Sequence, residues 1–168
     1  MNKGQMLVLE MGLNKVIELI KNSKNIGLKY KMAMNKEILN QECSIIKKLD
    51  NTTENYNSFQ RERMKINEDF SIKDDKGKAI IENKHFKIDP NLVKEYTDKM
   101  NELETKYRSD IEFRNEQIQK YNLFLNEDVE NSIVEKLKKI KLSDLEKESS
   151  LENESIDLFS SLLPIIEE

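Results

Sequence analysis

The side chains that most often do chemistry in proteins are few in this sequence and far apart. His85 is the only histidine, so neither a pair of histidine metal ligands nor a serine–histidine pair is available. Cys43 is the only cysteine, which excludes an internal disulfide and a metal site made of several thiolates. A lone thiol of this kind is typical of a protein in a reducing cytoplasm.

Acidic residues and glycines also lack the spacing of reactive loops. Asp74, Asp75 and Gly77 form a turn-like group without the alternating carboxylates and the distal glutamate of a calcium loop. The sequence contains no glycine-rich phosphate loop and no nucleophile elbow. The many other carboxylates are typical of the solvated faces of helices. We therefore expect a protein that is not an enzyme and that uses no metal or cofactor.

Charge is distributed unevenly along the chain. Lysines gather in two groups, Lys21, Lys24, Lys29, Lys31 and Lys36, with Tyr30 among them, and Lys136, Lys138, Lys139 and Lys141. The formal net charge of −4 gives the whole molecule no long-range attraction for phosphates, which argues against nucleic acid as the partner. Residues 142–168 hold eight acidic side chains against one lysine. This acidic tail can fold against the weakly basic remainder, repel or mimic nucleic acid, or stay solvated.

The composition favours a slim, mainly helical architecture. Of the 168 residues, 36% are charged and 37% hydrophobic, and the four glycines and two prolines are too few for the many turns of an all-β fold. We expect one domain whose first part, residues 1–26, contains an amphipathic helix over residues 7–22. Its apolar stripe is Leu9, Leu13, Val16, Ile17 and Ile20.

Residues 27–70 and 90–126 each repeat apolar side chains at helical spacing. The inward positions are Ile45, Leu49, Thr52, Tyr56, Phe59, Arg63, Ile66 and Phe70 in the first, and Val93, Tyr96, Met100, Leu103 and Tyr107 in the second. We expect two long helices folded back on each other as an antiparallel, coiled-coil-like hairpin. Residues 50–53 have poor helix propensity and mark a weak point. Asp89 is the expected N-cap of the second helix, with Pro90 at its first position.

Residues 71–89 have a different character and predict a small β-ribbon at the tip of the hairpin. Two strand candidates, residues 79–81 and 86–88, are separated by a turn at Asn83 and Lys84. The candidate protein-binding residues are Ile80, Ile81, His85 and Phe86, because an exposed β-edge with apolar side chains is a docking strip. In the alternative interpretation these residues only cap the hairpin.

Residues 127–168 predict short helices within the acidic tail. Val129, Ile133 and Leu137 suggest a helix of a few turns, and residues 140–142 are a strand candidate. Residues 156–163 form an amphipathic helix that Pro164 ends, and it is expected to dock on the first helix or on a second copy. A rod with one aromatic stripe has more apolar edge than one chain can cover, so we expect a homo-oligomer, most simply a dimer.

The order of these parts resembles a family of small proteins encoded in tailed-phage and prophage genomes of Gram-positive bacteria. The resemblance rests on the helix of residues 7–20, Leu28-Lys29-Tyr30-Lys31-Met32 before a long helix with Glu42, Lys73-Asp74-Asp75-Lys76-Gly77, and the endings Ile140-Lys141-Leu142-Ser143-Asp144-Leu145 and Leu163-Pro164-Ile165-Ile166. It implies an accessory protein that binds a host or phage protein. No segment has the roughly 20 apolar residues of a membrane span, and no signal peptide is recognisable, so a cytoplasmic location in the bacterial host is expected.

Three functions remain open from the sequence. The first is a non-enzymatic phage protein that binds another protein or assembly and inhibits a host defence or replication complex. The second is a structural or chaperone-like assembly factor of the virion. The third is a binder of nucleic acid or of a nuclease end.

Overall fold

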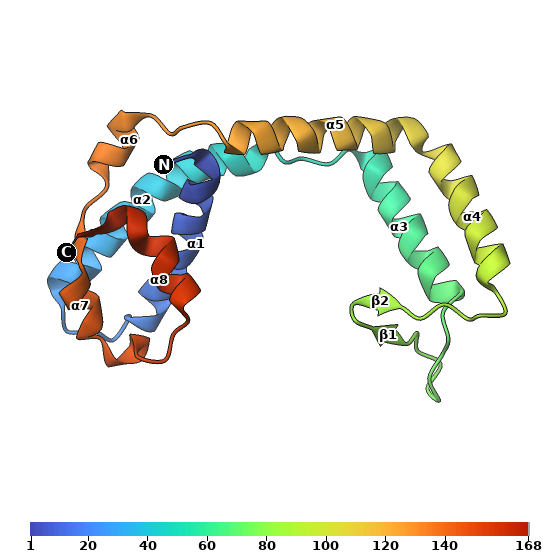
Figure 1. The fold of residues 1–168 in the computed structure, drawn as a ribbon, viewed down its shortest axis with the longest axis horizontal. Helices are drawn as coiled ribbons and strands as arrows, with labels where there is room; N and C mark the ends of the chain where they lie inside the picture. Colours follow the sequence, from blue (N-terminus) through green and yellow to red (C-terminus); the bar gives the residue numbers. More distant parts are fainter. Residues whose placement is uncertain (168) are drawn as a thin grey trace. The chain divides into compact units, whose positions relative to one another are not determined.

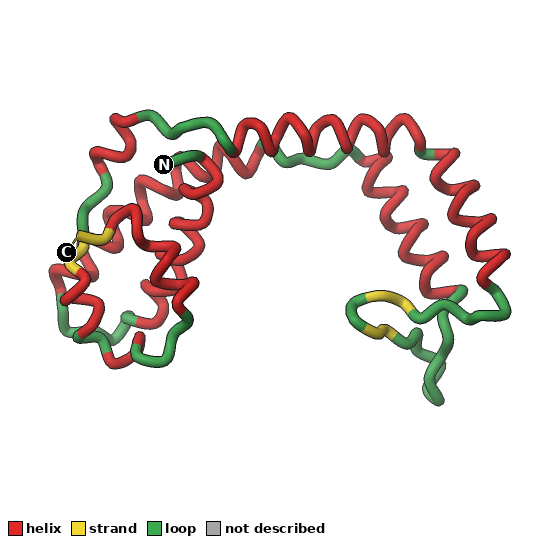
Figure 2. The backbone as a smooth tube through the Cα atoms, in the orientation of Figure 1, coloured by secondary structure: helices red, strands yellow, loops and turns green. Residues whose placement is uncertain are grey.

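The computed structural model describes residues 1–167 and is mainly helical (Figure 1; Figure 2). Where one domain was predicted, the contacts divide the chain into two compact units. Unit 1 is Met1–Asp50 together with Lys120–Glu168, and unit 2 is Asn51–Gln119. Each unit is described by itself below. Among the described residues, every helix is too short or too polar to cross a lipid bilayer.

Unit 1 is built around two helices, α1 (Lys3–Leu19) and α2 (Ile26–Lys48). Helix α1 begins four residues before the predicted start because Asn2 and Gln5 form a capping box, in which each side chain accepts a hydrogen bond from the other residue's backbone N–H. The predicted apolar stripe of α1 is confirmed, since Leu9, Leu13 and Val16 are fully buried. The buried positions of α2 follow a regular spacing of three and four: Leu28, Met32, Asn35, Leu39, Cys43 and Ile46.

The acidic tail folds into unit 1. It contains the short helices α7 (Leu142–Glu146) and α8 (Ile156–Leu162), and it follows α6 (Asn131–Lys136). Strand β3 (Ile140–Lys141) pairs in parallel with β4 (Ile166–Glu167). Helix α8 packs on α1, which is one of the two docking partners predicted for it, the first helix or a second copy. Ion pairs tie the tail to the helices, for example Lys15 with Glu154 at 2.5 Å.

Cys43 lies in the core of unit 1, and its thiol is not activated for reaction. Its thiol is buried and donates weakly to the carbonyl oxygen of Met6 at 3.7 Å. Burial, followed by the nearby Glu10 carboxylate, raises the pKa of the Cys43 thiol to about 12. A thiol with this pKa stays protonated at neutral pH, so Cys43 serves packing.

Unit 2 contains α3 (Glu54–Asp69), strands β1 (Ile81–Glu82) and β2 (His85–Phe86), α4 (Val93–Lys106) and most of α5 (Arg108–Leu125). Helices α3 and α4 lie side by side and run in opposite directions (Figure 1). Aromatic rings meet between them, with centroids 5.8 Å apart for Phe59 and Tyr107 and 6.0 Å for Phe70 and Tyr96. Phe59 and Leu103 are the only hydrophobic residues of unit 2 that are buried.

The two long helices predicted over residues 27–70 and 90–126 are each broken. Helix α2 ends at Lys48 and α3 begins at Glu54, because Thr53 caps the new helix by accepting from the Tyr56 N–H at 3.1 Å. This break falls at the predicted weak point. The second helix is interrupted at Tyr107, which separates α4 from α5. The sequence therefore predicts the helical class correctly and the helix lengths wrongly.

Two further details of the predicted hairpin differ from the structure. Ile45 and Leu49 are 58% and 54% exposed, and Ile46 is buried in their place. Asp89 does not cap a helix at Pro90. Its carboxylate instead accepts from the Asn91 N–H at 2.9 Å in a turn, and α4 starts at Val93. The face of α2 that α1 covers within unit 1 includes Leu39, Cys43 and Ile46, whereas Ile45 of the predicted seam stays exposed.

Candidate protein-binding site

The ribbon of unit 2 is a tight hairpin. Strands β1 and β2 are antiparallel, with Ile81 opposite Phe86 and Glu82 opposite His85. The connecting residues Asn83 and Lys84 both have positive φ angles, 50° and 67°, which is the signature of a type I′ turn. The predicted second turn is therefore confirmed, and strand β1 starts two residues later than predicted.

A third segment stabilises this ribbon and joins it to α3. The Ile72 N–H donates to the Lys87 carbonyl at 2.7 Å, and the Ile80 N–H donates to the Ile72 carbonyl at 2.9 Å. The Asp89 N–H donates to the carbonyl of Phe70, the residue that ends α3, at 3.0 Å. Because two strands alone are marginal in water, these additional bonds explain how the ribbon keeps a fixed place on the helices.

The four candidate residues of the ribbon do not share one face. Directly opposite residues of an antiparallel pair project to the same side, so Ile81 and Phe86 lie on one face and His85 lies on the other. Alternation along the strand places Ile80 on the side of His85. Ile81 is 59% exposed, His85 is exposed, and Ile80 and Phe86 are half-buried. The docking strip predicted from the sequence is thus two small surfaces.

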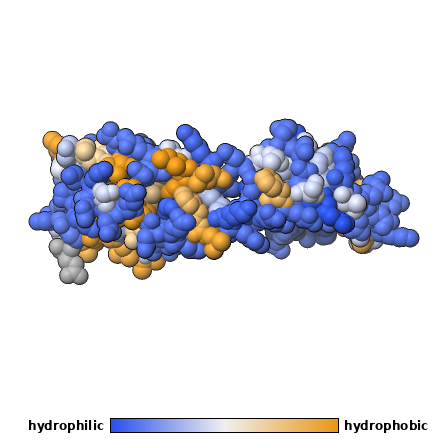
Figure 3. Space-filling view, turned by 90° about the horizontal axis from the view of Figure 1, so that it is seen from above, coloured by the Kyte–Doolittle hydropathy of each residue, from blue (hydrophilic) through white to orange (hydrophobic). Residues whose placement is uncertain are grey.

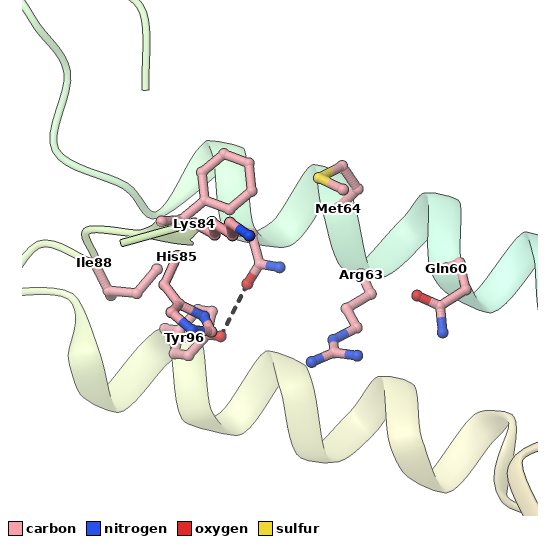
Figure 4. A pocket seen from close by; sticks show the side chains of 9 residues that line it. Gln60, Arg63, Met64, Lys84, His85, Ile88 and Tyr96 are labelled. Carbon is pink, nitrogen blue, oxygen red and sulfur yellow. Dashed lines mark hydrogen bonds between the residues drawn. The ribbon is translucent and has the colours of Figure 1, made fainter. Parts of the chain in front are cut away.

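A cavity of about 310 Å³ lies between the ribbon, α3 and α4, and His85 and Phe86 both line it (Figure 4). Arg63 and Met64 of α3 and Tyr96 of α4 are among the other residues that line it. The Tyr96 hydroxyl donates to the Asn67 side chain at 2.9 Å, which fixes the ring against α3. Figure 4 shows the Arg63 guanidinium extending from α3 toward α4, and Arg63 also lines a second, more open cavity farther along these helices.

The electrostatics of this surface favour an anionic partner. Arg63 and Lys84 line the cavity, none of whose lining side chains is acidic, and no ion pair of Arg63 is found within residues 1–167. Glu82, which lies opposite His85, forms an ion pair with Lys87. Farther along the helices, the ammonium group of Lys106 and then the Tyr107 hydroxyl lower the pKa of the Glu62 carboxyl, so this acid is paired. Within the described chain no cluster of three or more potential metal ligands occurs. The arrangement can hold an acidic or amphipathic partner segment by charge and apolar contact.

Arg63, Met64 and Tyr96 were missing from the sequence-based site. The helical pattern assigns Arg63 and Tyr96 to the inward seam and leaves Met64 outside it. In the structure Arg63 is exposed and Met64 is 51% exposed. An arginine at a position that the pattern predicts to be apolar was the one available signal, because a buried seam rarely accommodates an unpaired guanidinium.

The two lysine groups of the sequence both lie in unit 1. The buried Asn35 side chain holds the second group beside α2, since its Oδ1 accepts from the Lys138 N–H at 2.6 Å and its Nδ2 donates to the Lys138 carbonyl at 2.9 Å. In the space-filling view, hydrophobic side chains gather on unit 1, whereas unit 2 presents mostly hydrophilic ones (Figure 3). Exposed large hydrophobic residues also occur in unit 2, at Met64, Ile81, Val93, Phe113 and Ile118.

Replacing Lys84 with glycine is expected to stabilise unit 2 by about 1 kcal/mol, because a β-carbon at positive φ is strained and glycine relieves that strain. Thermal unfolding followed by circular dichroism measures the change. Lys76→Gly is the matched control in the neighbouring turn, where φ is not positive, and it is expected to be neutral or slightly destabilising. Equal effects of the two substitutions would contradict the type I′ turn.

No family model, no curated protein and no solved structure matches this chain.

Proposed function

We propose that this chain is a non-enzymatic accessory protein that binds another protein through the ribbon end of unit 2. The observation that supports the proposal most directly is the unpaired Arg63 at a cavity that the exposed Met64 and the half-buried Phe86 also line. The exposed Ile81 lies opposite Phe86 in the ribbon. Interfaces are enriched in arginine, methionine and aromatic residues at their centres, and this surface offers all three. A partner segment with acidic side chains and one apolar side chain fits the positive charge and the apolar side chains of this surface.

The resemblance to phage and prophage proteins gives the proposal its biological setting. In that setting the partner is a host protein or assembly, and a defence or replication complex is the expected target. The cytoplasm of the bacterial host is the corresponding place of action. Binding of such a target by an exposed hairpin end blocks a surface of the target and requires no chemistry from the hairpin itself.

The test compares affinity capture by three purified, tagged chains from the same bacterial lysate. The wild-type chain and the Lys76→Glu control are expected to retain one stoichiometric protein partner. The Arg63→Glu and Ile81→Asp double variant is expected to lose it, because the cation is reversed and the apolar contact is removed. The captured partner is then purified, and its affinity for each variant is measured by calorimetry.

Two results would contradict different parts of the proposal. Absence of a stoichiometric partner for the folded wild-type chain would oppose the binding function itself. Equal affinity of the wild-type chain and the double variant for the purified partner would keep the function and remove the ribbon end as its site. Circular dichroism of each variant shows whether the fold is intact.

A further inference from the structure

Unit 1 carries an apolar pocket with an acidic rim. The pocket has a volume of about 230 Å³, and its apolar wall consists of Leu142, Leu145, Leu151 and Phe159. Glu146, Glu148 and Glu152 surround it. No ion pair of these three glutamates is found within residues 1–167, so the rim keeps its negative charge. A pocket of this kind fits one branched apolar side chain with basic neighbours.

The same unit presents an apolar side chain with basic neighbours. Ile26, at the start of α2, is 80% exposed, and Tyr30, one turn later, is 62% exposed. Lys24 and Lys29 lie on either side of Ile26 in the sequence and are also exposed. Lys29 donates to the Lys21 carbonyl at 3.0 Å, which leaves its charge uncompensated. Residues 24–30 therefore form a convex basic surface with an apolar centre.

The chain places these two surfaces next to each other. The Ser23 hydroxyl donates to Glu148 of the acidic rim at 2.6 Å, and the Asn25 N–H donates to the Ser23 oxygen at 3.0 Å. Ser23 thus contacts the rim of the pocket, and Asn25, which is bonded to Ser23, leads directly into Ile26. Because Ile26 is 80% exposed, it does not fill the pocket of its own chain.

We propose that a second copy of this chain occupies this region, with Ile26 of each copy in the acid-rimmed pocket of the other. Two adjacent surfaces of opposite charge are self-complementary and so suit a twofold axis, because one rotation then forms both contacts at once. Lys24 and Lys29 of one copy face Glu146 and Glu152 of its partner. The inference is independent of the proposed function, which uses unit 2, and it places the predicted dimer contact in unit 1.

The apolar part of the proposal is tested by sedimentation equilibrium over a wide range of protein concentration. The wild-type chain is expected to form a reversible dimer that saturates at two copies. Ile26→Gln is expected to weaken the dimer at least roughly tenfold, because the side chain that fills the pocket is lost. Met11→Gln is the matched control, since Met11 is 69% exposed in α1 of the same unit, and it is expected to leave association unchanged.

The charges are tested by two complementary variants. Lys24→Glu with Lys29→Glu places glutamates opposite glutamates, and Glu146→Lys with Glu152→Lys places lysines opposite lysines, so each variant alone is expected to be a monomer. In an equimolar mixture, every contact of the mixed pair joins opposite charges again. A heterodimer is therefore expected, and it should weaken as salt is added. This recovery distinguishes a direct contact from a loss of folding.

Four results would overturn the proposal. The wild-type chain could sediment as a monomer up to several hundred micromolar, or Ile26→Gln could associate as tightly as the wild type. The mixture of the two charge variants could also stay monomeric while both partners keep their helical circular dichroism. Association that grows beyond two copies would show an open-ended contact in place of the reciprocal one.

Discussion

Gly12→Leu is expected to lower the free energy of unfolding of unit 1 by about 3 kcal/mol, because α8 packs directly on this position of α1. A β-carbon at Gly12 would lie 1.8 Å from the Ser161 Oγ and 2.8 Å from the Ser161 Cβ. The hydroxyl can rotate away, but the β-carbon of Ser161 moves only with the backbone of α8. Leucine therefore displaces α8 and exposes the Leu158 and Leu162 side chains that it buries.

Urea unfolding followed by circular dichroism measures this change, and hydrogen exchange assigns it to α1 and α8. Gly27→Leu is the control, because the nearest atom to a β-carbon there is the Asn25 Oδ1 at 3.6 Å, an ordinary contact. This control is expected to be neutral or slightly stabilising, since leucine favours helix over glycine. Wild-type stability of Gly12→Leu would mean that α8 does not pack on α1 at this point.

Asn35→Ala is expected to destabilise unit 1 by about 2–4 kcal/mol. Asn35 is fully buried, and its amide makes two hydrogen bonds with the backbone of Lys138. Alanine leaves the N–H and the carbonyl of Lys138 without this partner and opens a small cavity. Asn40→Ala on the exposed side of the same helix is the control and is expected to change the stability by less than about 0.5 kcal/mol.

Asn35→Asp separates the donor from the acceptor role of this side chain. The ionised carboxylate still accepts from the Lys138 N–H but faces the Lys138 carbonyl without a proton. The protonated acid restores the donor, so the native state favours protonation and the pKa of the introduced acid is raised in the folded state. The variant is then expected to regain stability as the pH falls, and to lose it as the pH rises above about 3.9, the unfolded value. Stability that does not recover in acid, relative to the wild type at the same pH, would contradict this geometry.

Much of the fold could be predicted from local patterns. Leu9, Leu13 and Val16 of α1 and the following Ile20 are buried in the core, and the turn at Asn83 and Lys84 closes the ribbon. Strand β1 begins late because Ala79, the predicted first residue of the strand, bridges to Lys73 instead. Helix propensity marked residues 50–53 as weak. It could not show that the Thr53 side chain would start a new helix there.

Local sequence patterns could not predict the long-range contacts that determine the tertiary structure. Asn35 and Lys138 are separated by 103 residues, and the type of neither residue predicts that the two form hydrogen bonds with each other. The parallel pairing of Ile140 with Ile166 likewise joins two strands of only two residues each, which are too short to give a periodic signal. Buried polar side chains such as Asn35 interrupt an apolar stripe, so a pattern of hydrophobic residues does not identify them.

The candidate site could be predicted only in part for a related reason. His85 and Phe86 were identified because the ribbon is a local structure with a recognisable turn. Arg63 and Tyr96 come from two helices whose contact depends on the register between α3 and α4. The sequence pattern constrains which faces meet but leaves the axial position of each side chain open. Met64 was missed because an exposed methionine does not stand out from its polar neighbours.

Unit 2 is an insertion between the two sequence segments of unit 1, and this has a kinetic consequence. To assemble unit 1, the chain must bring residues 50 and 120 together, at an entropic penalty that grows with the length of the intervening loop. Inside unit 2 the Arg114 guanidinium contacts the Asn51 carbonyl at 3.5 Å, so its first and last parts meet once it has folded. Early formation of the inserted hairpin would shorten the effective loop, and substitutions in unit 2 would then slow the refolding of unit 1 without touching any of its contacts.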